Sequence, residues 1–397
     1  MTVLTVISLL GLNAYCKQLV NGLMTTGMTD QVSWGMYIAN FTFLVGMAAA
    51  AVMLVIPVYI YRNKELHDLV IFGELLAVAV IVMCLLFVTV DLGRPQNFSH
   101  LMRRFNFPIS MLTWDVIVLN GYLLLNCHIT GYLIFCDYMK REPRKMLFVV
   151  PFVLVAIVWA VSIHTVTAFL YVGLGGRPFW NSAIIAPRFL ASAFSAGPAF
   201  IVLTLQVINR FSHYKIPRQA LLTLRQIILV ALTINVFLLV SELFTEFYTG
   251  SEHIASTRYL YFGLAGGYNT LVPWIWTALC MSSIALIILY LPLARSLRFF
   301  NIACLLIIFG IWIEKGAGLI IPAFIPTPLG EVVEYWPTWN ETLICLGIWA
   351  FGLLLYTIFV RITIPVLAGK LTYDTDYVYK PDGPSAPASL ESTAPTP

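Results

Sequence analysis

Charged residues are scarce in this chain of 397 residues. Asp, Glu, Lys and Arg make up 11% of it, whereas hydrophobic residues make up 60%. A soluble globular domain carries about 25% charged and about 45–50% apolar residues. The composition therefore excludes a soluble domain and indicates a polytopic membrane protein.

Clusters of basic residues are also lacking. The net charge is only +4, and the Lys and Arg residues are spread over short connections rather than gathered in a stripe. A nucleic-acid partner is therefore not expected. A cleavable signal peptide is not evident either, because the first apolar run lacks a basic lead-in and a small-residue cleavage site.

The seven cysteines contain no C-x-x-C pair and mostly fall inside apolar runs: Cys16, Cys84, Cys127, Cys136, Cys280, Cys304 and Cys345. The chain therefore has no ligand run for an iron–sulfur cluster and no covalent haem attachment motif. We interpret these cysteines as small hydrophobic residues, and we expect no metal site in this chain.

A b-type haem between two histidines is not expected either. His128 and His164 lie in mid-span, but at about 1.5 Å per residue their depths differ by about 16 Å. Two axial ligands of one iron must lie about 4 Å apart.

Long apolar runs are abundant instead. A membrane-spanning helix needs about 20 such residues, and the sequence predicts ten of them, which are Val3–Leu23, Trp34–Tyr61, Leu66–Val90, Ile109–Asp137, Met146–Val172, Ala183–Ile208, Leu221–Tyr248, Leu271–Leu293, Leu297–Ile321 and Thr342–Ile364. In the first run, Asn13, Lys17 and Gln18 also leave an interfacial helix open.

The spans predict an all-α polytopic integral membrane protein in three parts. Residues 1–28 form a peripheral transmembrane helix, residues 29–370 a membrane domain of nine helices, and residues 371–397 a Pro/Ala/Ser-rich disordered tail. Most Lys and Arg residues lie in the even-numbered connections and the tail, so both termini are predicted to be cytoplasmic, in the cytoplasmic membrane. The remaining arginines then lie outside: Arg94, Arg103, Arg104, Arg177, Arg188 and Arg258.

Ionisable residues within the spans are the candidate functional residues, because charge in a bilayer is costly. Asp115, His164, Glu242 and Glu314 lie on four different spans. At about 1.5 Å per residue, each is about 9–12 Å below the outer end, with Glu246 one turn above Glu242. This common depth predicts one site in the outer leaflet.

Other interpretations of these residues remain open. They are also compatible with separate hydrogen-bonded groups that hold helices together, or with a simple ion pair between Glu314 and Lys315. Nearer the cytoplasm, Glu74 and His128 are candidates for the start of a proton path.

A quinone head group is the ligand that best suits the four ionisable residues predicted at one depth in the outer leaflet. It needs hydrogen-bond partners for two carbonyls and a proton donor or acceptor for each reduction step, and a histidine and buried carboxyl groups supply these. No residue of the chain can carry an electron by itself. The electron must therefore come from a partner docked outside. Arg94, Arg103 and Arg104 are the candidate docking residues, and they are equally compatible with binding lipid phosphates.

Three segments resemble a known family. They are WGMYIANFTFLVGMAAAAVML (34–54), DLGRP (91–95) and the pair Trp114–Asp115, and they look like the NrfD/PsrC family of membrane subunits in quinone-linked redox complexes. The segments 241–263 and 271–279 are similar to its DsrP branch, the membrane subunit of the DsrMKJOP complex of sulfur metabolism.

The resemblance implies a fold of two four-helix bundles plus two peripheral helices. It implies a quinone-reactive subunit of a respiratory or sulfur-metabolism oxidoreductase rather than a stand-alone enzyme, without its own haem or iron–sulfur cluster. A periplasmic ferredoxin-like iron–sulfur subunit (DsrO-like) would dock outside and exchange electrons with menaquinone, and DsrM-, DsrK- and DsrJ-like subunits are further expected partners.

The resemblance also implies roles for individual residues. Asp115 and His164 match the acidic and histidine positions that handle quinone or protons in the family, and Trp34, Tyr37 and Asn40 lie on the helix that lines its pocket. Together with the depth argument, this predicts that Asp115, His164 and Glu242 act in catalysis. The residues predicted to bind quinone are Trp34, Tyr37, Asn40, Trp114, Asp115, His164, Glu246 and Glu314. Some relatives carry a further acid and histidine where this chain has Thr167, Ala168 and Asn181. Proton pumping therefore does not follow from the resemblance.

Three other functions compete with this interpretation. One is a membrane subunit of a related complex linked to a multihaem cytochrome or a hydrogenase. A proton-coupled secondary transporter would place charges at the midplane of two symmetric halves, whereas the charges here are shallow and on one side. An inert anchor would leave the row of buried charge unexplained.

Overall fold

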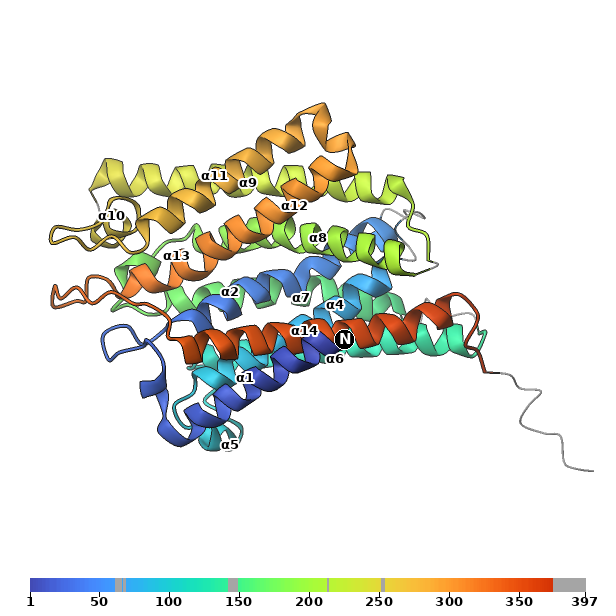
Figure 1. Ribbon diagram of the computed structural model, residues 1–397, viewed down its shortest axis with the longest axis horizontal. Helices are drawn as coiled ribbons and strands as arrows, with labels where there is room; N and C mark the ends of the chain where they lie inside the picture. Colours follow the sequence, from blue (N-terminus) through green and yellow to red (C-terminus); the bar gives the residue numbers. More distant parts are fainter. Residues whose placement is uncertain (61–65, 67–68, 142–148, 213, 251–253, 374–397) are drawn as a thin grey trace, which may run out of the picture.

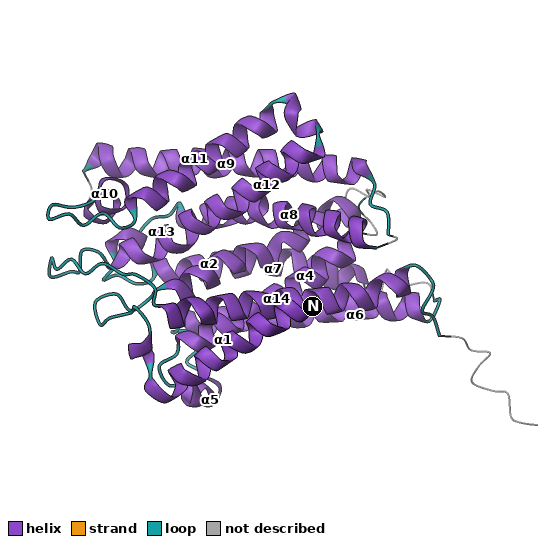
Figure 2. Ribbon diagram, viewed as in Figure 1, coloured by secondary structure: helices purple, strands orange, loops and turns teal. Residues whose placement is uncertain are grey.

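The computed structural model describes residues 1–373 except 61–65, 67–68, 142–148, 213 and 251–253. These residues form helices, turns and loops and contain no β-strand (Figure 2). The predicted all-α class is therefore confirmed. Of the predicted disordered tail, residues 374–397 lie outside the described residues.

Within the described residues, ten helical segments are long and apolar enough to cross a membrane. They comprise α1 (Thr2–Asn21), Met36–Tyr59 (containing α2, Met36–Ala48, and α3, Val52–Val55), α4 (Val70–Asp91), α6 (Met111–Tyr138), α7 (Val150–Val172), α8 (Ile185–Phe211), α9 (Arg218–Thr249), α11 (Val272–Tyr290), Leu297–Phe324 (containing α12, Leu297–Ile311, and α13, Gly318–Ile320) and α14 (Trp339–Leu367). Each coincides with one predicted span.

The long helices form two bundles of four with two helices added at one side (Figure 1). The first bundle consists of α2, α4, α6 and α7, and the second of α8, α9, α11 and α12. Helices α2 and α7 of the first pack against α8 of the second, while α1 and α14 pair with each other and α14 packs on α4. The seam between α2, α7 and α8 is therefore the centre of the molecule.

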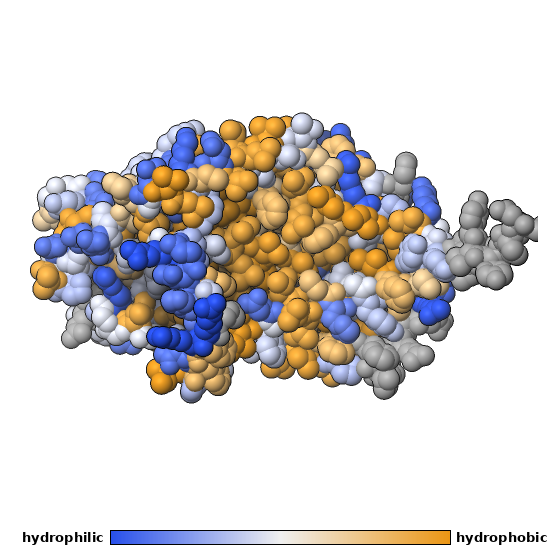
Figure 3. Space-filling view, turned by 90° about the horizontal axis from the view of Figure 1, so that it is seen from below, coloured by the Kyte–Doolittle hydropathy of each residue, from blue (hydrophilic) through white to orange (hydrophobic). Residues whose placement is uncertain are grey.

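The two short helices mark one end of the molecule. Both α5 (Phe98–Arg103) and α10 (Ile254–Phe262) lie at the end that also carries the loop 325–338, at the left of Figure 1. We call this the α10 end. It gathers the connections predicted to face outward. A broad hydrophobic band crosses the middle of the face seen in Figure 3, with hydrophilic residues gathered towards the two ends.

Glycines allow α1 and α14 to approach each other closely. A Cβ atom on Gly11 of α1 would stand 2.5 Å from the Cα of Gly347 in α14, so only a residue without a side chain fits at this crossing. Small residues at helix crossings are characteristic of membrane bundles, where backbone proximity replaces the hydrophobic effect as the source of packing energy.

The helix that follows α11 is not regular throughout. After α12 it changes to a π-helical turn, Trp312–Ala317, before α13 continues it. Gly316 in this turn lies against α2, since a Cβ there would be 3.0 Å from the carbonyl oxygen of Ala39. Single π turns within α-helices occur frequently at functional sites, and this one carries Glu314 and Lys315.

Candidate functional site

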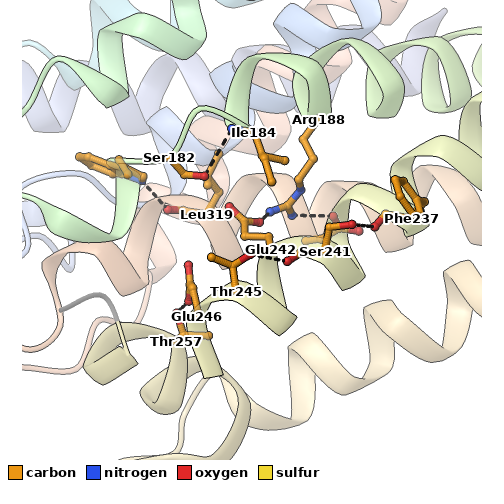
Figure 4. A network of polar contacts seen from close by, with 12 residues as sticks. Ser182, Ile184, Arg188, Phe237, Ser241, Glu242, Thr245, Glu246, Thr257 and Leu319 are labelled. Carbon is orange, nitrogen blue, oxygen red and sulfur yellow. Dashed lines mark hydrogen bonds and ion pairs between the residues drawn. The ribbon is translucent and has the colours of Figure 1, made fainter. Parts of the chain in front are cut away.

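An ion cluster lies within the second bundle, close to the α10 end. Arg188 of α8 contacts Glu314 with Nη2 at 2.8 Å from Oε1, and it forms a second ion pair with Glu242 of α9 through Nη1. Figure 4 shows the Arg188 side chain directed towards Glu242. We call these three residues the Arg188 cluster. It joins α8, α9 and the π turn by charge-assisted hydrogen bonds.

Lys315 has partners other than its neighbour in sequence. Its Nζ donates to the carbonyl oxygen of Phe189 at 2.8 Å and to Oγ of Ser192 at 2.6 Å, and it lies 3.8 Å from the centre of the Phe189 ring. The interpretation of Glu314 and Lys315 as a simple ion pair is therefore wrong. The π turn directs the two side chains to different partners on α8.

Glu246 lies one turn beyond Glu242 on α9. It accepts a hydrogen bond from Oγ1 of Thr257 in α10, and both side chains are drawn beside the Arg188 cluster in Figure 4. A cavity of about 20 Å³ lies between Glu246, Arg188 and Tyr261, which is room for about one water molecule. Burial raises the pKa of the Tyr261 hydroxyl above its ordinary value, so this hydroxyl is a neutral donor at ordinary pH.

Asn235 of α9 is buried next to this cluster. Neither its Oδ1 nor its Nδ2 has a hydrogen-bond partner within the part of the chain that the structure describes. It lines a cavity of about 10 Å³ together with Ser192, Glu314 and Lys315. A buried amide without partners costs about 1–3 kcal/mol, so the arrangement suits one bound water molecule or a polar group of a ligand.

Asp115 belongs to a different group of contacts, in the first bundle. Its Oδ1 accepts a hydrogen bond of 2.6 Å from Oγ1 of Thr167. One turn further along α7, the Tyr171 hydroxyl is 2.6 Å from Oγ1 of Thr42 in α2. These side chains link α6, α7 and α2 by neutral hydroxyl groups rather than by ion pairs.

His164 lies on α7 at the seam between the bundles and is completely buried. Its Nδ1 is 2.8 Å from the carbonyl oxygen of Ala160, which places the ring proton on Nδ1. Its Nε2 is buried and has no hydrogen-bond partner among the described residues. The ring centre is 6.4 Å from that of Phe194 in α8. His164 therefore directs a buried ring nitrogen towards the seam, beside the backbone of Gly46 in α2.

The structure divides the predicted row of ionisable residues. It joins Glu242 and Glu314 through Arg188 and places Glu246 at the same cavity. Asp115 is instead bonded to Thr167, on the other bundle. Equal depth did not imply proximity, because residues at one level can face different bundles.

The aromatic residues predicted near the quinone also separate. Trp34 packs in an aromatic group with Tyr171, Trp180 and Phe324 at the α10 end of the seam, with ring centres 5.5–6.0 Å from that of Trp34. Trp114 is half-buried, and its Nε1 donates to the carbonyl oxygen of Pro108.

Tyr37 and Asn40 of α2 have partners outside the seam. The Tyr37 hydroxyl donates to Gln18 of α1 at 2.7 Å. Oδ1 of Asn40 accepts from the indole nitrogens of Trp312 and Trp349, at 3.0 and 2.9 Å. Both side chains are thus used to join α2 to its neighbouring helices.

Glu74 and His128 do not meet. Glu74 is buried and accepts from Oγ1 of Thr130 at 3.1 Å, whereas His128 lies on the exposed face of α6 with its ring centre 4.3 Å from that of Phe152. The structure therefore does not bring together the two residues predicted to begin a proton path. Arg94, Arg103 and Arg104 are all exposed beside or within α5 at the α10 end, as a docking surface requires.

Arg188 was not recognised from the sequence as a site residue, because it was assigned to an outer connection. The structure places it in the first turn of α8, with its side chain only 14% exposed. Two glutamates inside neighbouring spans were a usable signal, because buried carboxylates in a membrane pair with cations. Asn235 and Thr167 were missed as well, since neutral polar residues in spans give no comparable signal.

Comparisons with known proteins agree on one family. The sequence model of the family "Polysulphide reductase, NrfD" matches residues 24–324. The chain is 26% identical over 331 residues to a putative dimethyl sulfoxide reductase membrane subunit of Halobacterium salinarum, covering 79% of this chain and 74% of that protein. It is 23% identical over 414 aligned positions to a selenate reductase subunit of Mesobacillus selenatarsenatis, covering 92% and 93%. It is also 24% identical over 210 residues to an Hdr-like menaquinol oxidoreductase integral membrane subunit of Archaeoglobus fulgidus, covering 53% and 50%.

Proposed function

Because the chain belongs to the NrfD family of polysulphide reductase membrane subunits, we propose that it is the membrane subunit of a multi-subunit reductase complex and exchanges electrons with menaquinone. The predicted family is thereby confirmed, while the DsrP branch stays a prediction. The names of two relatives support the proposal, since one is a reductase membrane subunit and the other an integral membrane subunit of a menaquinol oxidoreductase.

The observation that carries the proposal is the buried, unpartnered Nε2 of His164. Oxidation of a quinol to a quinone releases two electrons and two protons. A neutral histidine with its proton on Nδ1 can accept one of these protons on Nε2, and it can return it in the opposite direction. Its position between the bundles keeps bulk water away from that exchange.

Asp115 is the proposed second proton acceptor on the same side of the seam. Its carboxyl group is bonded to the neutral Thr167 hydroxyl, so it can gain or lose a proton without breaking an ion pair. The quinone head group would then lie between α6, α7 and α2, beneath the aromatic group around Trp34. Tyr171, in contact with this aromatic group, completes the wall.

Glu246 is assigned to proton transfer and the Arg188 cluster to a fixed charged framework beside that path, rather than either of them to contact with the head group. They lie between the seam and α10, around water-sized cavities. Protons released near His164 would leave towards the α10 end through Glu246 and water held in these cavities. This proposal revises the predicted roles of Glu242, which was expected to act in catalysis, and of Glu246 and Glu314, which were expected to bind the quinone.

We further propose that the electrons pass to or from an iron–sulfur subunit docked at the α10 end. The exposed Arg94, Arg103 and Arg104 would face an acidic surface of that subunit, which favours rapid association. A DsrO-like partner with DsrM-, DsrK- and DsrJ-like subunits, location in the cytoplasmic membrane and cytoplasmic termini remain part of this proposal.

The substitution His164→Ala tests the proposal. We expect it to reduce quinol-dependent turnover of the purified complex by about 10²–10⁴-fold, the usual contribution of a general acid–base group, while the subunits still assemble. The control is Ser162→Ala on the same helix, whose hydroxyl bonds to its own backbone at Val158. Wild-type turnover in the His164 variant would remove this residue from the site.

A further inference from the structure

We propose that the polyprenyl tail of the quinone lies in an apolar groove between α8 and α9, and that Phe194 forms the wall between this groove and His164. This inference rests on the proposed function, since it assigns the path by which the same substrate enters and is held.

The groove is large enough to hold part of a prenyl chain, with a volume of about 690 Å³. Small-molecule sites typically measure about 300–1,000 Å³. Its walls come from α8 (Leu190, Phe194) and α9 (Val230, Ile234), with Met53 of α3 contributing from the side of the first bundle. Val230 and Ile234 are 59% and 48% exposed, so the groove opens towards the surrounding hydrocarbon.

Phe194 connects the groove to the proposed head-group site. Its ring lines the groove, and the centre of that ring is 6.4 Å from the centre of the His164 ring. A single aromatic side chain thus separates a lipid-facing groove from a buried proton acceptor. Rotation of a partly exposed phenylalanine is a fast motion, and it would open a direct path between the two.

The chemistry of the groove favours a prenyl chain over a phospholipid. Among the described residues that line it, Gln226 is the one polar side chain, and none is charged and able to hold a phosphate. Two buried cations near α8 are already partnered, Arg188 with two glutamates and Lys315 with Phe189 and Ser192. A long neutral chain that ends in an uncharged head group therefore fits better than an anionic lipid.

The test blocks the groove with Val230→Trp in the purified complex and compares two quinols with the same naphthoquinol ring, one with a long prenyl tail and one without a tail. We expect KM for the long-tailed quinol to rise by about tenfold, as lost burial of prenyl groups predicts, and KM for the tail-less quinol to remain unchanged. The matched control is Val240→Trp, because Val240 is 58% exposed on the same helix and does not line the groove.

A second measurement does not depend on turnover. Solvent extraction of the purified complexes should yield less bound menaquinone from Val230→Trp than from Val240→Trp. Equal amounts, or equal effects on the long-tailed and tail-less quinols, would show that the groove holds only surrounding lipid and would overturn the inference. A wild-type complex that oxidises neither quinol would instead overturn the proposed function.

Discussion

The two bundles hold buried carboxyl groups in opposite ways. In the first bundle, Asp115 is bonded to the hydroxyl of Thr167, and Glu74 to that of Thr130. In the second, Glu242 and Glu314 share one arginine. A carboxyl group on a hydroxyl can change its proton without losing a counterion, whereas a carboxylate on an arginine cannot. The first bundle is therefore suited to proton exchange with a substrate, and the second to a fixed electrostatic framework beside it.

The largest expected effect is a loss of stability when Arg188, the cation that two glutamates of the second bundle share, is removed. The substitution Arg188→Met leaves the buried Glu314 and the partly buried Glu242 without a partner, and loss of one member of a buried ion pair costs about 3–5 kcal/mol. We expect a much lower yield of assembled complex and a lower Tm in detergent. The control is Arg258→Met, since Arg258 is exposed on α10.

The triple variant Arg188→Met/Glu242→Gln/Glu314→Gln should restore most of the lost stability, because it removes the unpaired charges together with the cation. If the single and triple variants are equally unstable, the arginine matters for packing rather than for charge, and the contrast between the two bundles fails.

A smaller effect on stability but a large one on activity is expected in the first bundle. Asp115→Asn keeps an oxygen that can accept from Thr167 but removes the exchangeable proton. We expect the free energy of unfolding to change by about 1 kcal/mol and quinol-dependent turnover to fall by about 10²–10⁴-fold. Turnover and thermal unfolding should be measured on the same preparation.

Thr167→Ser supplies the matched comparison, because it retains the hydroxyl that bonds to Asp115 and should retain turnover. A normal rate in Asp115→Asn would mean that this carboxyl group only joins α6 to α7 as a structural hydrogen-bond acceptor.

The smallest effect is expected at the other carboxyl–hydroxyl pair of the first bundle. Thr130→Val removes the donor to Glu74 and should cost about 1–3 kcal/mol, the penalty of an unpartnered buried group, without changing turnover. Thr165→Val, whose hydroxyl bonds to its own helix at Val161, is the control. A loss of turnover greater than the loss of folded protein would place Glu74 on a functional proton path.

Much of the fold followed from the sequence. All ten apolar runs became helices within a few residues of the predicted limits, because a backbone surrounded by hydrocarbon must satisfy its own hydrogen bonds. The break at Glu314 and Lys315 did not follow, since hydropathy does not distinguish a π turn from an α-helix. The close pairing of α1 with α14 through Gly11 and Gly347 could not be predicted either, because these residues are far apart in sequence.

The sequence pointed to ionisable residues within spans as candidate site residues, but it did not predict the contacts between them. His164, Asp115 and Glu242 were identified because ionisable groups within a span stand out against apolar neighbours. Arg188 was misplaced because it was counted with the outer connection, although it lies within the predicted span Ala183–Ile208 and its helix begins three residues before it. Asn40 was expected at the quinone, yet its carbonyl is occupied by two tryptophans.

By itself, the sequence determined the membrane-protein class, the number of spans and the family resemblance, because these depend on composition and on the length and order of the apolar runs. Only the tertiary structure decided which charges meet. The rotation of each helix about its own axis and its neighbours in the bundle are set by side-chain packing, and they placed Asp115 with Thr167, Glu314 with Arg188, and the free nitrogen of His164 at the seam between the two bundles.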